Sequence, residues 1–160
     1  MKLSAYFRLA ELVRSETAQR MGIDNRPPPR VMRNLRRLAL GLDRVQRILR
    51  RPVEVSSGYR SPVLNRAVGG SPRSRHQAGL AADFACPSFG RPFRVCRALR
   101  RRGLAFDQMI HEFGDAADGG WVHLAFGRRN RRRTLTIRAR DPRYVPGIRP
   151  SPRRWEAGRP

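Results

Sequence analysis

Two histidines and one aspartate have the types and spacing that metal chemistry needs. His76 and Asp83 lie seven positions apart in SRHQAGLAAD (74–83), and His123 lies in WVHLAF (121–126). A catalytic zinc site uses three protein ligands with nitrogen or oxygen donors and keeps one position open. Two imidazoles and one carboxylate meet this need, so we expect one Zn²⁺ per chain. The alternative is that His76 is an ordinary loop histidine and Asp83 an edge-strand charge.

Strand alternation turns Asp83 and His123 away from the apolar faces of their strands and toward a possible cleft. Residues 80–85 and 121–126 each alternate apolar side chains with small or polar ones, and Asp83 and His123 fall on the second phase. The neighbours of Asp83 on this phase are alanines, which leave room for an ion. An acid in such an apolar segment is costly to bury without a partner.

Glu112 is the expected general base. It shares a strand phase with Gln108 and Ile110, whereas His111 has the opposite phase and is expected to pack in the interior. A carboxylate beside a zinc site can take a proton from water. A solvated strand carboxylate is the alternative.

Several motifs, in this order, resemble the zinc D-Ala-D-Ala carboxypeptidase family of peptidoglycan peptidases. They are SSGYRSPVLN (56–65), VGGS (68–71), SRHQAGLAAD (74–83), FDQMIHE (106–112) and WVH (121–123). The lead-in AELVRSETA (10–18) and GIDN (22–25) resembles that of short bacterial and phage-borne members. The resemblance covers about residues 5–127.

The resemblance implies an α+β fold of the hedgehog type. It implies a small antiparallel sheet with helices packed around it and a zinc site in a cleft on the sheet. It also implies that His76, Asp83 and His123 hold the zinc.

Substrate-binding residues are implied in the same way. The motif arginine corresponds to Arg60, which is expected to contact a substrate carboxylate or carbonyl oxygen and to steady developing negative charge. Ser74 is expected to hydrogen-bond near the site. Gln108 and Trp121 are further substrate-binding candidates on the strands that carry the base and the last ligand.

One position departs from the family pattern. Many relatives have glutamate three residues before the last histidine, and here that position is Gly120. The segment 114–120 lengthens the hairpin loop between Glu112 and Trp121. Glu112 faces the cleft if the strands keep register; a slip by one residue turns it away and leaves Asp118 as the reserve base.

Hydrophobic periodicity predicts the elements that must position these residues. We expect a single domain over 1–140, with a helical lead-in over about 3–50 and a catalytic core over about 52–127, followed by an extended or disordered Pro/Arg-rich tail, 141–160. Helices are expected within 3–22 (one or two) and over 31–50, 61–68 and 91–102; strands are expected at 53–56, 80–85, 106–113, 121–126 and 134–137.

The charge is large: 35 Lys+Arg against 12 Asp+Glu, formally +23. It favours an anionic partner, but every basic residue except Lys2 is arginine, so a bias in composition explains it as well. The run RRNRRR (128–133) gives some support to an Arg-rich nucleic-acid binder. No motif of that class occurs and no aromatics interleave with the run, so we expect electrostatic attraction to an anionic cell envelope and no specific nucleic acid.

Two kinds of targeting segment bear on the expected location of the protein. No apolar run approaches the roughly 20 residues that span a bilayer, and the first residues lack the apolar region of a signal peptide. We expect a monomer made in the cytoplasm that acts on the cell wall after release, after lysis or as part of a virion.

These observations lead to two main functional hypotheses. The first is a zinc metallopeptidase that hydrolyses an amide bond in peptidoglycan stem peptides, as a D,D-carboxypeptidase or an L-Ala-D-Glu-type endopeptidase, in the manner of a phage endolysin or tail-associated enzyme. The second is a non-catalytic zinc module of the same fold that binds wall peptide or a protein partner. The bond that is cut stays open, because these activities share one zinc site and differ in their subsite loops.

Overall fold

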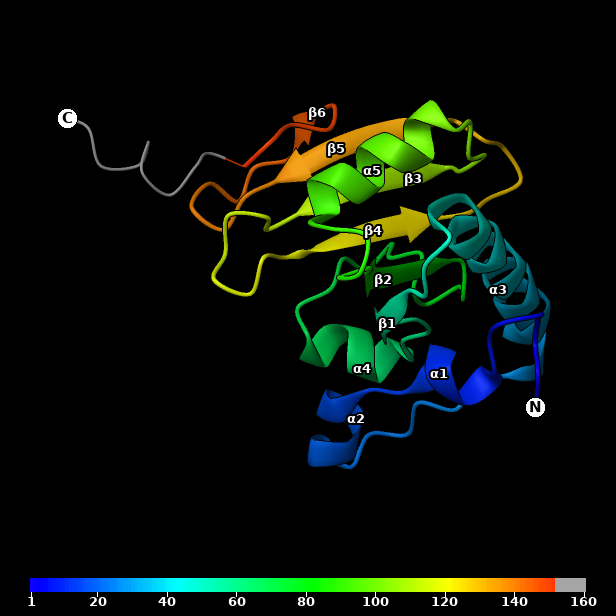
Figure 1. Ribbon diagram of the computed structural model, residues 1–160. Coiled ribbons are helices and arrows are strands. Elements are labelled where there is room, and N and C mark those ends of the chain that lie inside the picture. The colour runs from blue at the N-terminus through cyan, green and yellow to red at the C-terminus, as the bar shows by residue number, and fades with distance from the viewer. Residues whose placement is uncertain (152–160) are drawn as a thin grey trace.

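The computed structural model describes residues 1–151 as helices around one six-stranded sheet (Figure 1). The helices are α1 (Leu9–Val13), α2 (Glu16–Met21), α3 (Pro29–Leu49), α4 (Pro62–Ala67) and α5 (Pro92–Arg101). The strands are β1 (Glu54–Ser57), β2 (Ala81–Ala85), β3 (Gln108–Glu112), β4 (Trp121–Ala125), β5 (Arg133–Ile137) and β6 (Val145–Pro146). The helices and strands expected from periodicity up to residue 137 are therefore confirmed, with small shifts at their ends.

The sheet confirms the α+β class and adds one parallel pair. The strand order is β1-β2-β4-β3-β5-β6, and all neighbours are antiparallel except β3 and β5. Strand β4 lies between β2 and β3, so neither of its edges is free. The chain that leaves β4 therefore crosses β3 and pairs with the outer edge of β3 as β5. A strand that returns antiparallel to β4 lies parallel to β3, so the sheet is mixed where a wholly antiparallel one was expected.

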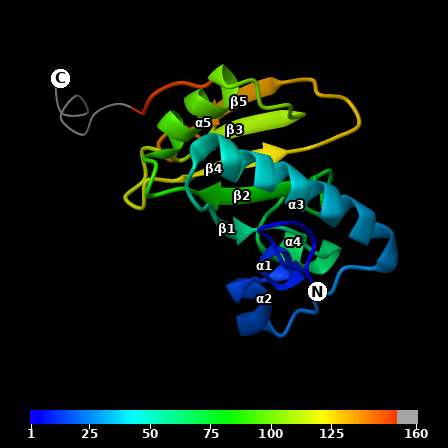
Figure 2. The same ribbon diagram turned by 45° about the vertical axis from the view of Figure 1, so that its right-hand side comes forward.

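Helices α3 and α5 cover one face of this sheet (Figures 1 and 2). The apolar stripe of α3 recurs at intervals of three and four residues and faces inward. One cluster joins both helices to β2, β3 and β4, and its central members are Leu35, Leu38, Leu42, Val95, Leu99, Phe84, Met109 and Leu124. The apolar strand phase thus faces the helices, and the polar phase is left for the opposite face.

The buried carboxylate of Asp43 attaches the N-terminal segment to α3. Asp43 is 1 % exposed, and its oxygens accept hydrogen bonds from the Ser4 hydroxyl (2.8 Å) and from the amides of Ala5 (3.0 Å) and Tyr6 (3.2 Å). These donors offset the cost of burying the charge. In the sequence Asp43 looks like one more charge on a basic helix.

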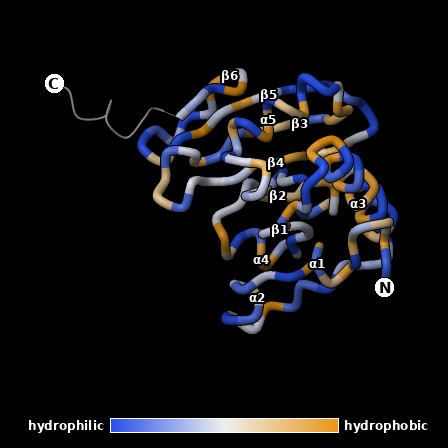
Figure 3. Tube along the Cα trace, viewed as in Figure 1, coloured by the Kyte–Doolittle hydropathy of each residue, from blue (hydrophilic) through white to orange (hydrophobic). Residues whose placement is uncertain are grey.

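The arginine run before β5 is partly structural. Figure 3 shows the loop between β4 and β5 as strongly hydrophilic. The Arg131 guanidinium donates two hydrogen bonds to the buried Asp107 carboxylate, each of 2.6 Å, and holds the pKa of Asp107 below its usual value. The Arg132 guanidinium lies 5.5 Å from the centre of the Phe106 ring. Two arginines of this run therefore anchor the loop to the sheet.

The segment after β5 returns along the sheet as far as the described residues reach. Strand β6 pairs with β5, and the Thr136 hydroxyl donates to the Gly147 carbonyl (2.8 Å) and accepts from the Arg149 amide (2.9 Å). The expected tail, 141–160, is described only to Ser151, and the rest of it lies outside the described residues. The division into a domain and a tail stays a prediction. Within residues 1–151, no helix has the length and apolar character needed to cross a membrane.

A glycine inside α3 provides a test of this packing. Alanine at Gly41 should stabilise an isolated helix by about 1 kcal/mol, but here its Cβ would overlap the Phe126 ring. We expect Gly41→Ala to lower the free energy of unfolding by about 1–3 kcal/mol, because overpacking outweighs helix propensity. Denaturant titration measures this value.

The control for this prediction is Leu40→Ala, at an exposed position of the same helix. It should change stability by less than about 1 kcal/mol. In a Phe126→Leu background the cost of Gly41→Ala should shrink, because the smaller side chain leaves room. A stabilising effect of Gly41→Ala in the wild-type background would contradict the packing described here.

Candidate metal centre

Three side chains from two neighbouring strands and one loop converge on the open face of the sheet. Asp83 of β2 is the register partner of His123 of β4, and His76 comes from the loop that precedes β2. His123 Nδ1 lies 2.8 Å from Asp83 Oδ1, and His76 Nε2 lies 3.2 Å from the same oxygen and 3.3 Å from His123 Nδ1. All three residues are buried, and their ligand atoms form a group that could hold a metal ion.

The fold orients His76 through a backbone carbonyl. His76 Nδ1 lies 2.6 Å from the carbonyl oxygen of Gly58, so Nδ1 donates its proton there and Nε2 is left with a lone pair toward the cluster. Gly58 is sterically required, because a Cβ on it would overlap the Leu12 carbonyl. Ser74, a predicted substrate-binding residue, accepts a hydrogen bond from the His76 amide (3.3 Å) and so supports this loop.

The cluster is electrostatically coupled. Burial opposes ionisation of Asp83, but His76 and His123 hold the pKa of its carboxyl below the usual range. Burial likewise opposes a charged His123, and the hydrogen bond to Asp83 outweighs it and raises the pKa of that imidazole. The carboxylate is therefore ionised at neutral pH and available as an anionic ligand.

Arg60 lies against the far side of the same carboxylate. Its guanidinium donates to Asp83 Oδ2 (2.6 Å) and to the Ser57 hydroxyl (2.8 Å). Both Asp83 and Arg60 are largely buried, so each neutralises the other in a region of low dielectric. Asp83 thus uses one oxygen toward the histidines and the other toward Arg60.

Glu112 faces the cleft beside this cluster. It pairs in register with Trp121, whose indole N–H donates to Glu112 Oε2 (2.7 Å). Burial raises the pKa of the Glu112 carboxyl, and the negative charge of Asp83 raises it further. A raised pKa makes the carboxylate a stronger base.

The longer loop before β4 folds away from the cleft. Strands β3 and β4 keep register up to the Glu112–Trp121 pair, and Phe113 begins the loop with a left-handed backbone, φ 52°. Gly120 has φ 65°, and a Cβ there would overlap the backbone of residues 112–113. Glycine at the position of the family glutamate is thus required by the way this loop closes.

Asp118, the reserve base of the sequence prediction, lies in this loop outside the cleft lining. It is exposed, and it accepts a hydrogen bond from the Gly120 amide (3.0 Å). The loop borders a hollow beside residues 90–92 instead. Glu112 is therefore the carboxylate that the structure brings next to the ligands.

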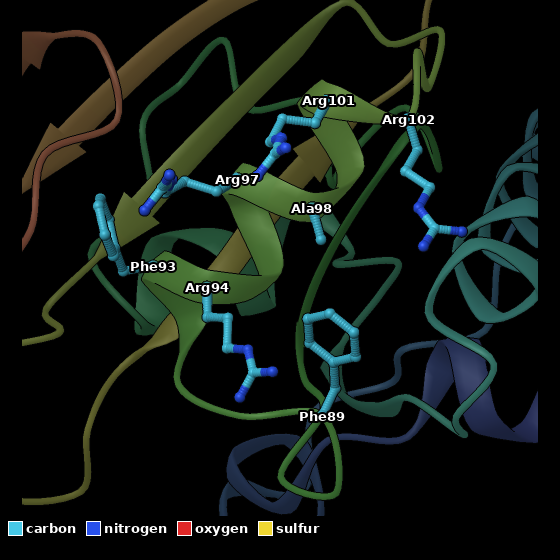
Figure 4. A pocket seen from close by; sticks show the side chains of 7 residues that line it. All are labelled: Phe89, Phe93, Arg94, Arg97, Ala98, Arg101 and Arg102. Atoms are coloured by element: carbon cyan, nitrogen blue, oxygen red, sulfur yellow. The ribbon is translucent and has the colours of Figure 1, made fainter.

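A large cleft of about 1200 Å³ opens over the cluster. The predicted substrate-binding residues Arg60, Ser74, Gln108 and Trp121 all line it, together with Glu112. A smaller pocket of about 740 Å³ lies beside α5, lined by Phe89, Phe93, Ala98 and four arginines (Figure 4). This second pocket has no carboxylate or imidazole in its lining, whereas the cleft contains the His76, Asp83 and His123 cluster together with Glu112.

The donor set fits zinc. Ligand atoms about 2.0–2.2 Å from a tetrahedral ion lie about 3.3–3.6 Å from one another, and the three separations here are 2.8, 3.2 and 3.3 Å. Two nitrogen donors and one oxygen donor leave a fourth position open toward the cleft. The Gly58 carbonyl supplies the outer hydrogen bond that zinc-binding histidines use for orientation.

Sequence reasoning found the cluster but missed its supports. The contribution of Gly58 is a carbonyl oxygen, which no residue type reveals, and Ser57 stood unremarked inside the arginine motif. The expectation for His111 is confirmed: it is buried, and its Nδ1 lies 2.9 Å from the Arg149 carbonyl.

A family model described as Peptidase M15 matches residues 5–125, which is more than half of the chain. No curated protein matches the chain.

Metal binding can be tested on the isolated protein. The wild-type chain should bind about one zinc ion, and His123→Ala should bind almost none, because a two-ligand site holds zinc poorly. Metal analysis after dialysis against a weak chelator measures the stoichiometry.

The matched control is His111→Gln, at a buried histidine outside the cluster, which should keep its zinc. Circular dichroism confirms that both variants are folded. Full zinc retention in folded His123→Ala would refute the assigned ligand set.

Proposed function

This chain belongs to the peptidase M15 family, and on that premise we propose that it is a zinc-dependent peptidase that hydrolyses an amide bond in the stem peptide of peptidoglycan. Family membership confirms the resemblance inferred from the motifs and supports a metallopeptidase. The single observation that carries the proposal is the buried His76, Asp83 and His123 cluster with the Glu112 carboxylate beside it in one cleft.

A zinc ion held by the cluster would supply Lewis acidity toward the scissile carbonyl and toward water. Glu112 takes a proton from the attacking water and passes it to the leaving amine. The Trp121 indole holds one carboxylate oxygen and so orients the base. The low exposure of the site strengthens these electrostatic interactions.

Arg60 is proposed to hold the substrate. Its guanidinium is fixed by Asp83 and Ser57 at the floor of the cleft, so its charge is already oriented before substrate binds. From there it would bind a substrate carboxylate or steady the developing oxyanion. Gln108 and Trp121 line the cleft as further contacts, whereas Ser74 acts through the His76 loop.

The finer activity is also part of the proposal. D,D-carboxypeptidase and L-Ala-D-Glu-type endopeptidase activity are the two candidates, in the setting of a phage endolysin or tail-associated enzyme that reaches the wall after release or lysis. Mass spectrometry of peptidoglycan digested by the zinc-loaded protein identifies the bond that is cut. Zinc binding without hydrolysis of any peptidoglycan preparation would favour a non-catalytic wall-binding module.

Glu112→Gln isolates the base from the metal site. Turnover of stem peptides should fall by about 10²–10⁴-fold, because the amide cannot accept the proton, while zinc binding stays at the wild-type level. Chromatographic assay of product and metal analysis on the same sample measure both quantities.

Asp118→Asn is the matched control for the base. This loop carboxylate should be replaceable with little loss of turnover. Wild-type activity in Glu112→Gln, or a large loss in Asp118→Asn, would show that the base is assigned wrongly.

Trp121→Phe should change the pH dependence. Activity falls at low pH as Glu112 is protonated, and the indole N–H favours the charged carboxylate and so lowers its pKa. Removal of the donor should raise this pKa, so the acid limb of kcat/KM should move to higher pH by about 1 unit or less.

Phe113→Leu is the control for the pH profile. It trims a ring that packs 5.1 Å from the Trp121 ring but leaves the indole donor in place. Its acid limb should coincide with that of the wild type. A shift of the Trp121→Phe limb to lower pH would contradict this account of the base.

A further inference from the structure

One wall of the cleft comes from residues beyond the region matched by the family. The match ends at residue 125, and the lining continues with Arg131, Arg133, Leu135 and Tyr144. Strand β5 pairs with β3, so this wall is continuous with the strand that carries Glu112. This wall of the cleft is therefore formed by residues outside the part of the chain that the family model matches.

Alternation along β6 brings Tyr144 to the cleft. Val145 pairs with Thr136, which is buried on the opposite sheet face with His111. Tyr144, one residue earlier, therefore points to the open face, where it lines the cleft at 57 % exposure. Its hydroxyl has no hydrogen-bond partner within residues 1–151.

Arg133 is a cation on the same wall with no acidic partner in the described part of the chain. It pairs in register with Gln108, another cleft residue. Arg131 and Arg75 bind Asp107, and Arg60, which is proposed above to act beside the metal cluster, binds Asp83. The positive charge of Arg133 is therefore available to a ligand.

We propose that Arg133 forms a subsite for a substrate carboxylate, so that the enzyme prefers acidic peptides over their amides, with the Tyr144 hydroxyl as a neutral contact farther along the same wall, at the Glu112 end of the strand pair. This inference rests on the proposed function and specifies its substrate class. The guanidinium offers paired donors to a carboxylate. Burial and the charges of Glu112 and Asp83 raise the pKa of the Tyr144 hydroxyl, so it keeps its proton at neutral pH.

Two further arginines add positive charge to the other walls of the cleft. Arg14 and Arg73 line the cleft from the N-terminal segment and from the loop before His76, and neither side chain forms an ion pair within residues 1–151. The cleft therefore presents net positive charge toward its occupant. A peptide with several carboxylates fits this potential better than a neutral one.

The experiment compares matched peptides that differ in one group. A soluble stem peptide with a free glutamate α-carboxylate is compared with the same peptide carrying the α-carboxamide, and a second pair varies the carboxylate of the following diamino acid. Hydrolysis by the zinc-loaded chain gives kcat/KM. Binding to zinc-loaded Glu112→Gln, by calorimetry, gives affinity without turnover.

For at least one pair, the wild type should prefer the acid by about tenfold or more, as expected for a charge-assisted contact. Arg133→Gln should remove most of that preference through a loss on the acidic peptide alone. Tyr144→Phe, at the Glu112 end of the wall, should keep the preference. Arg129→Gln makes the same charge change in an exposed loop outside the cleft and should keep the preference.

The outcomes separate the two proposals. Hydrolysis with no preference for the acid in either pair, or equal losses on acid and amide in Arg133→Gln, would overturn the subsite and leave the peptidase proposal standing. Binding with the Arg133-dependent preference but without hydrolysis by the wild type would support the subsite and overturn the peptidase. Neither binding nor hydrolysis would overturn both.

Discussion

The register between β2 and β4 is the constraint on which the rest of the site depends. Asp83 and His123 are direct partners across this antiparallel pair, so the backbone hydrogen bonds that join the strands also set the distance between two members of the candidate metal cluster. A slip by one residue would turn one of them into the apolar core. The alternation is held by Phe84 and Leu124, which belong to the core cluster under α3 and α5 and would leave it if their strand slipped by one residue. Core packing thereby fixes the geometry of the metal centre.

The two faces of the sheet have different roles: one packs the apolar core, and the other carries the ionisable side chains. The helix-covered face holds the aliphatic cluster, and the open face holds ionisable groups whose charges are balanced locally. Asp83 is balanced by Arg60 and the two histidines, and Asp107, just before β3, is balanced by Arg131 and Arg75. Burying either carboxylate alone would cost free energy, and the hydrogen bonds and charges of its partners offset that cost.

Much of this arrangement could be predicted from the sequence. In α3 the apolar residues recur every three to four positions, and in β2 and β4 they alternate with small or polar ones. Both patterns follow from which side chains are buried, so these elements and their buried faces could be predicted. The His76, Asp83 and His123 cluster could be predicted because motif spacing and strand phase agreed. The parallel placement of β5 and the tethering role of Asp43 could not be predicted, because both depend on contacts between segments far apart in the chain. Tyr144 was missed because a Pro- and Arg-rich stretch looks unstructured when its pairing partner is unknown.

The way the β3–β4 loop closes has a consequence for how this protein can be modified. Left-handed residues at both ends, Phe113 and Gly120, turn residues 114–119 out of the cleft while the last strand pair stays in register. A change in the length of this loop should therefore leave the position of Glu112 unchanged. An affinity tag or a small binding domain inserted at the exposed Ala117–Asp118 tip would be carried outside the cleft, which makes this hairpin a natural attachment point for a redirected enzyme.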